Sequence, residues 1–241
     1  MLAGMAVEGR TIIVTGAGSG IGKAIAEGFL REGARVVAAD IQPAGLASLE
    51  AAGALVQQTD VSEREQVDAL VERAAGETGR VDALFNNAGT GSVTRVEDQG
   101  SGEFERLVAI HLFGALHGMR AAIPHMRARG YGRIVNTLSR AAEVCAPRSS
   151  AYSAAKAGLW ALTRAAAAET ADADILVNGL IPGPTNTAIW RRDMPQLQPP
   201  EVVYPTARML ATLAAGGPSG QVFWDEKPYP LMDPANPRPQ R

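Results

Sequence analysis

Short runs rich in β-branched residues alternate with longer Ala-rich segments along nearly the whole chain. This alternation is typical of parallel strands that are joined by helical crossovers. We expect strands at residues 11–15, 35–39, 55–58, 81–85, 133–138, 175–180 and 221–224, and helices at residues 21–32, 44–52, 63–78, 103–129, 151–170 and 200–213. The pattern therefore predicts an α/β fold with a doubly wound, seven-stranded parallel sheet flanked by helices.

The length of the chain suits one sizeable hydrophobic core, because 46% of its 241 residues are apolar. We expect a single domain over residues 1–226 and a proline-rich C-terminal tail over residues 227–241. Five prolines exclude a helix in the tail, so it is either extended against a neighbour or disordered. Residues 189–201 also break the strand and helix pattern, and they could form a lid.

Charge and cysteine content narrow the possible partners and location. The formal net charge is −2 and the two signs are interspersed, which argues against nucleic acid or an anionic membrane as a partner. The single cysteine, Cys145, cannot form an internal disulfide and fits a reducing compartment. We find no leader-like start and expect no apolar run long enough to cross a bilayer. These features predict a soluble, cytoplasmic protein.

A glycine-rich turn follows the first expected strand and opens the next helix, where backbone N–H groups can face a pyrophosphate. The candidate contacts in this turn are Gly16, Gly18, Ser19, Gly20, Ile21 and Gly22. The spacing is Gly-x-x-x-Gly-x-Gly and differs from the widespread Gly-x-Gly-x-x-Gly. Such a turn can also serve purely steric needs, so it is weak evidence alone.

Asp40 ends the second expected strand, where an acidic side chain can accept hydrogen bonds from the adenosine ribose. The same carboxylate would repel a 2′-phosphate, and no basic residue adjoins it in the sequence. Together with the glycine turn, Asp40 predicts NAD(H) as the cofactor in preference to NADP(H). Without the turn, Asp40 could equally be a solvated loop residue.

Three residues in the second half of the chain could carry acid–base chemistry. Ser139 follows the fifth expected strand, and Tyr152 and Lys156 are four residues apart on a helix, so their side chains share one face. A free tyrosine has a pKa of about 10, and a neighbouring ammonium group such as that of Lys156 is expected to lower it. Tyr152 can then exchange a proton with a substrate oxygen that Ser139 holds. A Tyr-x-x-x-Lys pair alone could be a chance pattern.

Four further segments make the chain resemble the short-chain dehydrogenase/reductase family: Asp60-Val61, Asn86-Asn87-Ala88-Gly89, Ser139 with Tyr152-x-x-x-Lys156, and Pro182-Gly183. The resemblance covers about residues 8–224 and is to the standard short branch of the family. It implies a Rossmann-type fold and an NAD(H)-dependent oxidoreductase that interconverts a secondary alcohol and a ketone by hydride transfer. Tyr152 is then the general acid/base, and no metal is needed.

The same resemblance implies further cofactor contacts. Asp60 and Val61 are expected beside the adenine; Asn87, Ala88 and Gly89 beside the ribose; Pro182 and Gly183 after the sixth strand; Thr187 or Thr185 at the carboxamide; and Tyr152 and Lys156 at the reacting end. The family commonly forms homodimers or homotetramers, and an apolar face on the helix at residues 151–168 would suit such packing.

His111 stands where the family usually has an asparagine that binds a relay water next to the lysine. An imidazole can also hold water and titrates near neutrality, so His111 either keeps the relay and adds a pH-dependent step, or is a satisfied helix residue that leaves the relay weakened. Replacing His111 by Asn is expected to change the pH profile in the first case. A second departure is Trp224-Asp225-Glu226, which replaces the family's usual Asp-Gly-Gly.

The substrate side has candidate residues of two groups. Arg140, Glu143, Cys145 and Arg148 lie between Ser139 and Tyr152, and Trp190, Arg191, Arg192 and Met194 lie in the expected lid. The lid composition suits an apolar or aromatic alcohol or ketone, although Arg191 or Arg192 could bind a carboxylate. Two alternative functions stay open: a 3-oxoacyl-thioester reductase, and a nucleotide-binding protein of this fold without catalysis.

Overall fold

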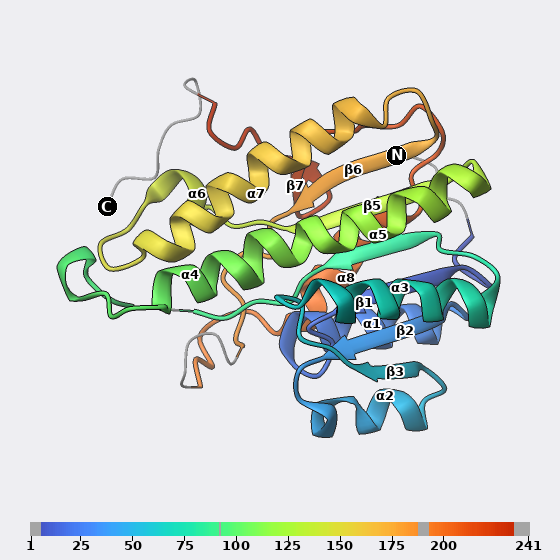
Figure 1. The fold of residues 1–241 in the computed structure, drawn as a ribbon, viewed down its shortest axis with the longest axis horizontal. Helices are drawn as coiled ribbons and strands as arrows, with labels where there is room; N and C mark the ends of the chain where they lie inside the picture. Colours follow the sequence, from blue (N-terminus) through green and yellow to red (C-terminus); the bar gives the residue numbers. More distant parts are fainter. Residues whose placement is uncertain (1–5, 92, 188–192, 234–241) are drawn as a thin grey trace.

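The computed structural model describes residues 6–91, 93–187 and 193–233, and these residues form one eight-stranded sheet with helices on both faces (Figure 1). The strands are β1 (Thr11–Thr15), β2 (Arg35–Asp40), β3 (Leu55–Gln58), β4 (Ala83–Asn86), β5 (Gly132–Thr137), β6 (Ile175–Leu180), β7 (Val222–Trp224) and β8 (Lys227–Pro228). Their order is β3-β2-β1-β4-β5-β6-β7-β8. The predicted doubly wound α/β fold is confirmed.

The predicted count of seven strands is one too low. Residues Lys227–Pro228 pair with β7 in the antiparallel direction, whereas β1 to β7 are mutually parallel. The amide of Tyr229 continues this pairing by donating to the Val222 carbonyl oxygen (2.8 Å), and Leu231 is buried. Residues 227–229 of the expected tail therefore pair with the sheet of their own chain, residues 230–233 form a turn after them, and residues 234–241 lie outside the described part.

The helices that connect the strands are α1 (Gly20–Arg31), α2 (Ala47–Ala51), α3 (Arg64–Thr78), α4 (Glu103–Val108), α5 (Gly114–Arg129), α6 (Ala141–Val144), α7 (Ser150–Glu169) and α8 (Tyr204–Ala211). Short 3-10 helices lie at Pro43–Leu46, Val96–Asp98 and Pro200–Val203. A π-helix, η3 (Ala109–Phe113), joins α4 to α5, so the helix expected over residues 103–129 has the predicted extent but an irregular centre. π-Helical turns inside α-helices are frequent at functional sites.

The helical run Glu103–Arg129 corrects one expectation. By length and composition it is apolar enough to cross a membrane, whereas we expect no such run from the sequence. Its C-terminal part, α5, contacts α3 and the strands β4 and β5, and 39% of the most apolar window of the run is buried. A single core helix of an α/β domain commonly passes the same test, so the finding is weak evidence for a membrane span.

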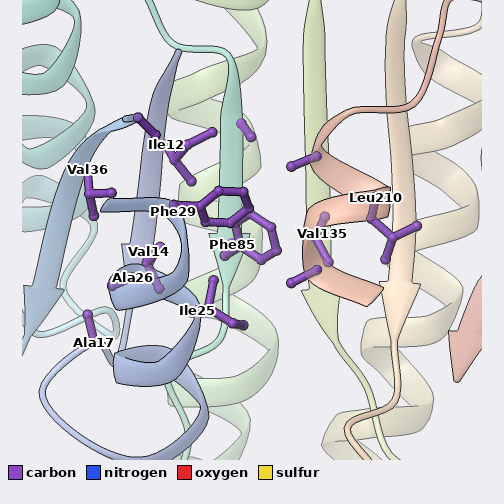
Figure 2. Close-up of a cluster of buried hydrophobic side chains, with 14 of the residues drawn as sticks. Ile12, Val14, Ala17, Ile25, Ala26, Phe29, Val36, Phe85, Val135 and Leu210 are labelled. Atoms are coloured by element: carbon purple, nitrogen blue, oxygen red, sulfur yellow. The ribbon is translucent and has the colours of Figure 1, made fainter. Parts of the chain in front are cut away.

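Both faces of the sheet are buried because successive side chains of a strand point to opposite sides. Ile12 and Val14 of β1 belong to the core under α1 and α8, whereas Ile13 belongs to the core under α3, α5 and α7. Figure 2 shows the first core, where Phe29 of α1 lies against Phe85 of β4 with ring centroids 5.4 Å apart. This packing fixes α1 over the sheet and thereby places the glycine turn at its start.

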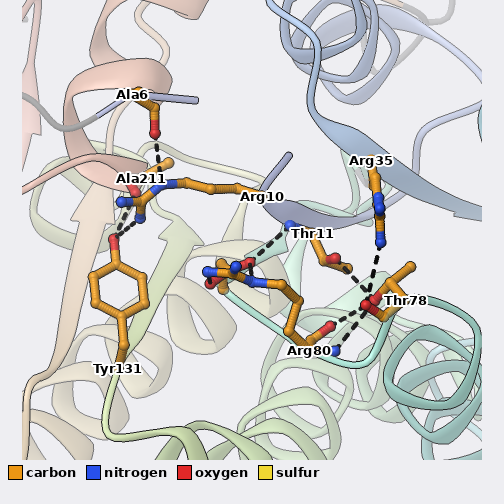
Figure 3. A network of polar contacts seen from close by, with 9 residues as sticks. Ala6, Arg10, Thr11, Arg35, Thr78, Arg80, Tyr131 and Ala211 are labelled. Carbon is orange, nitrogen blue, oxygen red and sulfur yellow. Dashed lines mark hydrogen bonds and ion pairs between the residues drawn. The ribbon is translucent and has the colours of Figure 1, made fainter. Parts of the chain in front are cut away.

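A polar network stabilises the side of the sheet at which the parallel strands begin (Figure 3). The fully buried carboxylate of Asp82 accepts hydrogen bonds from the Thr11 amide (2.8 Å) and from two nitrogens of Arg80 (2.5 Å each). Nearby, Arg10 donates to the Ala6 carbonyl oxygen (2.6 Å) and to the Tyr131 hydroxyl. Because the glycine turn follows the other end of β1, this network stabilises the edge that faces away from the candidate site.

Candidate active site

The glycine turn and the Asn87–Gly89 segment meet where the strand order reverses, between β1 and β4. The Thr15 hydroxyl accepts hydrogen bonds from the amides of Asn87 (3.1 Å) and Ala88 (3.2 Å). A Cβ atom on Gly16 would lie 2.7 Å from the Ala88 Cα atom, so this contact requires glycine. In open parallel sheets, ligands bind in the crevice outside the carboxyl ends of the strands at such a reversal.

The residues at this crevice fit a dinucleotide. The first turn of α1 has no acidic side chain, and Ser19 at its N-cap makes no side-chain capping bond, so backbone N–H groups at the positive end of a 12-residue helix stay available to an anion. Asp40 lies beside the turn, where its carboxylate accepts hydrogen bonds from the amides of Gly18 (2.8 Å) and Gln42 (2.9 Å). A Cβ atom on Gly18 would lie only 2.9 Å from that carboxylate.

Asn87 and Thr137 connect the cofactor side to Lys156. The Asn87 side-chain amide donates to the Thr15 carbonyl oxygen (3.2 Å), and its oxygen accepts from the Thr137 hydroxyl (3.2 Å). The carbonyl oxygen of Thr137 in turn accepts a hydrogen bond from Lys156 Nζ (2.6 Å). The buried Lys156 is therefore held by the backbone of β5, and burial lowers its pKa to about 7.

Tyr152 lies one helical turn before Lys156, and the lysine Nζ is 5.6 Å from the centre of its ring. Burial raises the pKa of the Tyr152 hydroxyl, and hydrogen bonding with the Ser139 side chain opposes that rise. The expectation that Lys156 lowers the pKa of Tyr152 is therefore wrong for this structure, because desolvation disfavours both charged forms. Ser139, Tyr152 and Lys156 are nevertheless brought together, as the sequence predicts.

His111 joins this group from the π-helix η3. Its ring packs edge-on against Tyr152 with centroids 5.1 Å apart, and its Nε2 atom lies 2.8 Å from the Thr90 carbonyl oxygen. Nε2 also lies 3.3 Å from the Thr90 amide nitrogen, so it donates to the Thr90 carbonyl oxygen in one tautomer and accepts from the Thr90 amide in the other. In both tautomers the buried Nδ1 atom has no hydrogen-bond partner among the described residues. A Cβ atom on Gly89 would lie 2.5 Å from His111 Cε1, so glycine makes room for the ring.

Burial and the nearby charge of Lys156 lower the pKa of His111 to about 3. The imidazole is therefore neutral near pH 7, and the expectation that its own titration adds a step near neutrality is wrong. His111 and Lys156 both line a small cavity, together with Thr15 and Asn86. The centre of a water molecule could occupy about 10 Å³ of this cavity. That volume is about the room that one water molecule needs.

The remaining predicted residues lie around this crevice at varying distances. Asp60 turns to the start of α3, where its carboxylate accepts from the Ser62 amide (2.9 Å) and hydroxyl (2.6 Å). Val61 lines the small cavity, and Thr187 lies against Gly20, whose Cβ atom would be 3.1 Å from Thr187 Cγ2. Thr185 is buried, and Pro182 and Gly183 follow β6.

The expected lid is described only in part. Residues 188–192, which include Trp190, Arg191 and Arg192, lie outside the described residues. The described end at Met194 is held by its amide, which donates to the Asn186 side chain (3.0 Å). Asn186 also donates to Asp193 (2.6 Å).

Sequence reasoning missed Thr137 and Thr90, which hold Lys156 and His111. Thr137 holds Lys156 through its backbone carbonyl oxygen, so its residue type carried no signal for that contact, and only its hydroxyl, which donates to Asn87, depends on the side chain. Thr90 acts through its backbone carbonyl oxygen, which any residue type supplies, so its identity carried no signal.

Comparison with known proteins agrees with this arrangement. The family model for short chain dehydrogenases matches residues 10–198. Cis-4-hydroxycyclohexanecarboxylate dehydrogenase of Sinomonas cyclohexanicum is 37% identical over 230 residues, which are 93% of this chain and 88% of that protein. D-beta-hydroxybutyrate dehydrogenase of Rhizobium meliloti (strain 1021) is 32% identical over 194 residues, which are 77% and 75% of the two chains.

A solved structure is similar over almost the whole fold. The 3-ketoacyl-(acyl-carrier-protein) reductase from Brucella melitensis, crystallised as a complex with NADH, has a TM-score of 0.84 and 31% sequence identity. The similarity covers 90% of this chain and 96% of that chain. From the family match and these relatives, we conclude that the chain belongs to the short-chain dehydrogenase/reductase family of oxidoreductases.

Proposed function

We propose that the protein is an NAD(H)-dependent oxidoreductase that interconverts a secondary alcohol and a ketone, with Tyr152 as the general acid/base. The observation that carries this proposal is the continuous set of contacts from the glycine turn through Asn87 and Thr137 to Lys156, beside Tyr152. It links the candidate cofactor side to the candidate proton donor within one rigid sheet edge. The relatives support the substrate class, since their names describe dehydrogenases of hydroxy acids.

The cofactor choice rests on Asp40 and the start of α1. The N–H groups of α1 would hold the pyrophosphate, and the Asp40 carboxylate would hold the adenosine ribose and repel a 2′-phosphate. When bound, the nicotinamide ring supplies or accepts the hydride. The NADH complex of the similar reductase supports the same choice.

Proton transfer would use the residues as they stand in the structure. Ser139 would hold the substrate oxygen by a hydrogen bond, and Tyr152 would give its proton to a ketone oxygen or take one from an alcohol. Because burial raises the pKa of Tyr152, its hydroxyl carries the proton near pH 7, which is the state that ketone reduction requires.

The proton that Tyr152 gives away must be replaced, and Lys156 with His111 offers a route. Lys156 and His111 border the cavity that has room for one water molecule, and the buried His111 Nδ1 atom has no hydrogen-bond partner among the described residues. Of the two interpretations of His111, we therefore favour a neutral residue that holds a relay water over a hydrogen-bonded helix residue that has no part in the relay.

Assembly and location form part of the same proposal. We infer a homodimer or homotetramer, because Phe113 at the end of η3 and Leu116 in α5, three positions apart on one helical run, expose 48% and 40% of their surface. One domain and a cytoplasmic location are inferred from the length and from the single cysteine.

A second candidate is a 3-oxoacyl-thioester reductase, and the similar Brucella melitensis structure favours it. Preference for NADH does not separate the two candidates, since that reductase was crystallised with NADH. The substrates do: a thioester-linked 3-ketone would be reduced much faster than the free ketone only by the second type of enzyme.

The test is a panel of cyclic and linear ketones and 3-oxoacyl thioesters assayed with NADH and with NADPH. We expect turnover with NADH, loss of that turnover by at least about a hundredfold in Tyr152→Phe, and unchanged NADH binding by fluorescence. Tyr131→Phe, at the opposite edge of the sheet, is the matched control and should keep its activity. NADH binding without turnover on the whole panel would support the non-catalytic alternative, and activity retained in Tyr152→Phe would remove the tyrosine from the mechanism.

A further inference from the structure

The chain after β8 packs against the segment that follows Ser139. We call residues 229–232 the strap. Leu231 of the strap is buried in a small core with Leu138, which precedes Ser139, and with Ala142 of α6. The strap therefore packs on the turn that leads from β5 into α6.

A buried carboxylate joins the strap to α6. The side chain of Glu143 is only 8% exposed, and it accepts hydrogen bonds from the Tyr229 hydroxyl and from the Met232 amide (3.0 Å). It also lies 3.7 Å from Arg140 Nε, and the Arg140 guanidinium lies over the ring of Trp224 at 5.6 Å. A carboxylate is buried at a cost unless its hydrogen bonds are satisfied, and here both of its oxygens have partners.

α6 is in direct contact with the Ser139 side chain. The Ala141 amide donates to Ser139 Oγ (3.1 Å), and the Ala142 amide donates to the Ser139 carbonyl oxygen (3.1 Å). Cys145, the C-cap residue that follows α6, has a left-handed φ of +48°, and Met232 has one of +59°. Non-glycine residues adopt this conformation at a cost in free energy, so other contacts must hold both segments in place.

We propose that the strap is a positioning device for the reaction: Glu143, held by Tyr229 and Met232, fixes α6 and thereby the direction in which Ser139 presents its hydroxyl to the substrate oxygen. This inference rests on the proposed function for the role of Ser139. Glu143 and Tyr229 are positioning residues, since they act through α6. A hydrogen-bonded carboxylate selects one geometry more strictly than an apolar contact of the same size would.

The test compares Tyr229→Phe and Glu143→Gln in the full-length protein. Tyr204→Phe is the matched control, because the Tyr204 hydroxyl also donates to a glutamate, Glu32 (3.0 Å), but between α1 and α8. We expect kcat for ketone reduction to fall about tenfold in both strap variants, while KM for NADH changes less than twofold. The control should keep its kcat even where it loses as much thermal stability. If the strap variants and Tyr204→Phe lose the same thermal stability but only the strap variants lose kcat, the strap positions Ser139 and does not merely stabilise the fold.

Hydrogen exchange gives a readout that does not depend on turnover. Amides of residues 139–145 should exchange faster in Tyr229→Phe than in the wild type and in Tyr204→Phe, while those of the glycine turn should not change. If Glu143→Gln does not fold, Tyr229→Phe carries the test. Unchanged exchange together with kcat within twofold of the wild type would overturn the proposal. A wild type without turnover would contradict the proposed function alone, and faster exchange at residues 139–145 would still support the strap.

Discussion

Replacing His111 by Asn removes a buried imidazole whose pKa is lowered to about 3 by burial and by the nearby charge of Lys156. In an unfolded chain the same group has a pKa of about 6.5. Because the folded-state pKa lies below the unfolded one, protons bind preferentially to the unfolded chain when the pH falls below about 6.5. The free energy of unfolding of the wild type therefore decreases as the pH falls, and this loss ends only near pH 3, where the folded protein also binds the proton.

The size of the effect follows from the two pKa values. At pH 5, about 1.5 pH units below the pKa of the unfolded imidazole, that imidazole is protonated while the folded one is neutral. At roughly 1.4 kcal/mol per pH unit, His111 costs the wild type about 2 kcal/mol between pH 7 and pH 5. His111→Asn lacks this titration, so the variant should lose about 2 kcal/mol less than the wild type over the same interval.

Urea unfolding of the cofactor-free protein, followed by tryptophan fluorescence at pH 7 and pH 5, measures this difference. His125→Asn is the control, because His125 is partly exposed and lies 3.0 Å from the Glu72 carboxylate, so its loss should not reproduce the effect. Equal losses of unfolding free energy in the wild type and in His111→Asn would refute the reasoning. The same low pKa implies that His111→Asn changes the level of turnover without removing a pH limb near neutrality, where Lys156 titrates.

Two further predictions concern stability away from the site. Asp225 and Glu226 connect β7 to β8 with left-handed φ values of +49° and +60°, and the Glu226 amide donates to the Thr206 hydroxyl (2.9 Å). Glu226→Gly keeps this amide and relieves the backbone strain, so it should raise the free energy of unfolding by about 1 kcal/mol and the melting temperature by roughly 2–4 °C. An unchanged or lower melting temperature in calorimetry would contradict this. Asp82→Ala should lower the free energy of unfolding, measured in urea, by about 3 kcal/mol, because the Thr11 amide and Arg80 lose their buried acceptor. The affinity for NADH should stay the same. A loss below about 1 kcal/mol would show that water replaces the carboxylate.

Much of the fold could be predicted from the sequence because each element has a local signal. The strands β1, β2 and β6 are short apolar runs that end at a glycine, an acidic residue or a proline-glycine pair, and the structure places them within about one residue of the prediction. Parallel order then brings their carboxyl ends to one edge. For that reason, residues as distant in sequence as Gly16 and Ser139 can be expected at the same crevice from the sequence alone.

The parts that could not be predicted depend on contacts between distant segments. The strap pairs Tyr229 and Met232 with Glu143, which lies 86 and 89 residues earlier, and no local pattern encodes that partner. The π-helix η3 forms within a segment whose composition suits an ordinary α-helix. The eighth strand contains Pro228, which can occupy only an edge position, so its pairing with β7 follows from the tertiary structure.

The protonation states of the site were the least predictable feature, because they depend on burial. A charged lysine next to a tyrosine suggests a lowered tyrosine pKa, yet both side chains are desolvated here, and desolvation lowers the pKa of Lys156 while it raises that of Tyr152. If Tyr152 is the acid, ketone reduction can begin from this state, since the hydroxyl already carries its proton. Alcohol oxidation needs the phenolate, and therefore an added positive charge near Tyr152. The cofactor-free site is thus set for proton donation, and the oxidative direction should depend more strongly on pH than the reductive one.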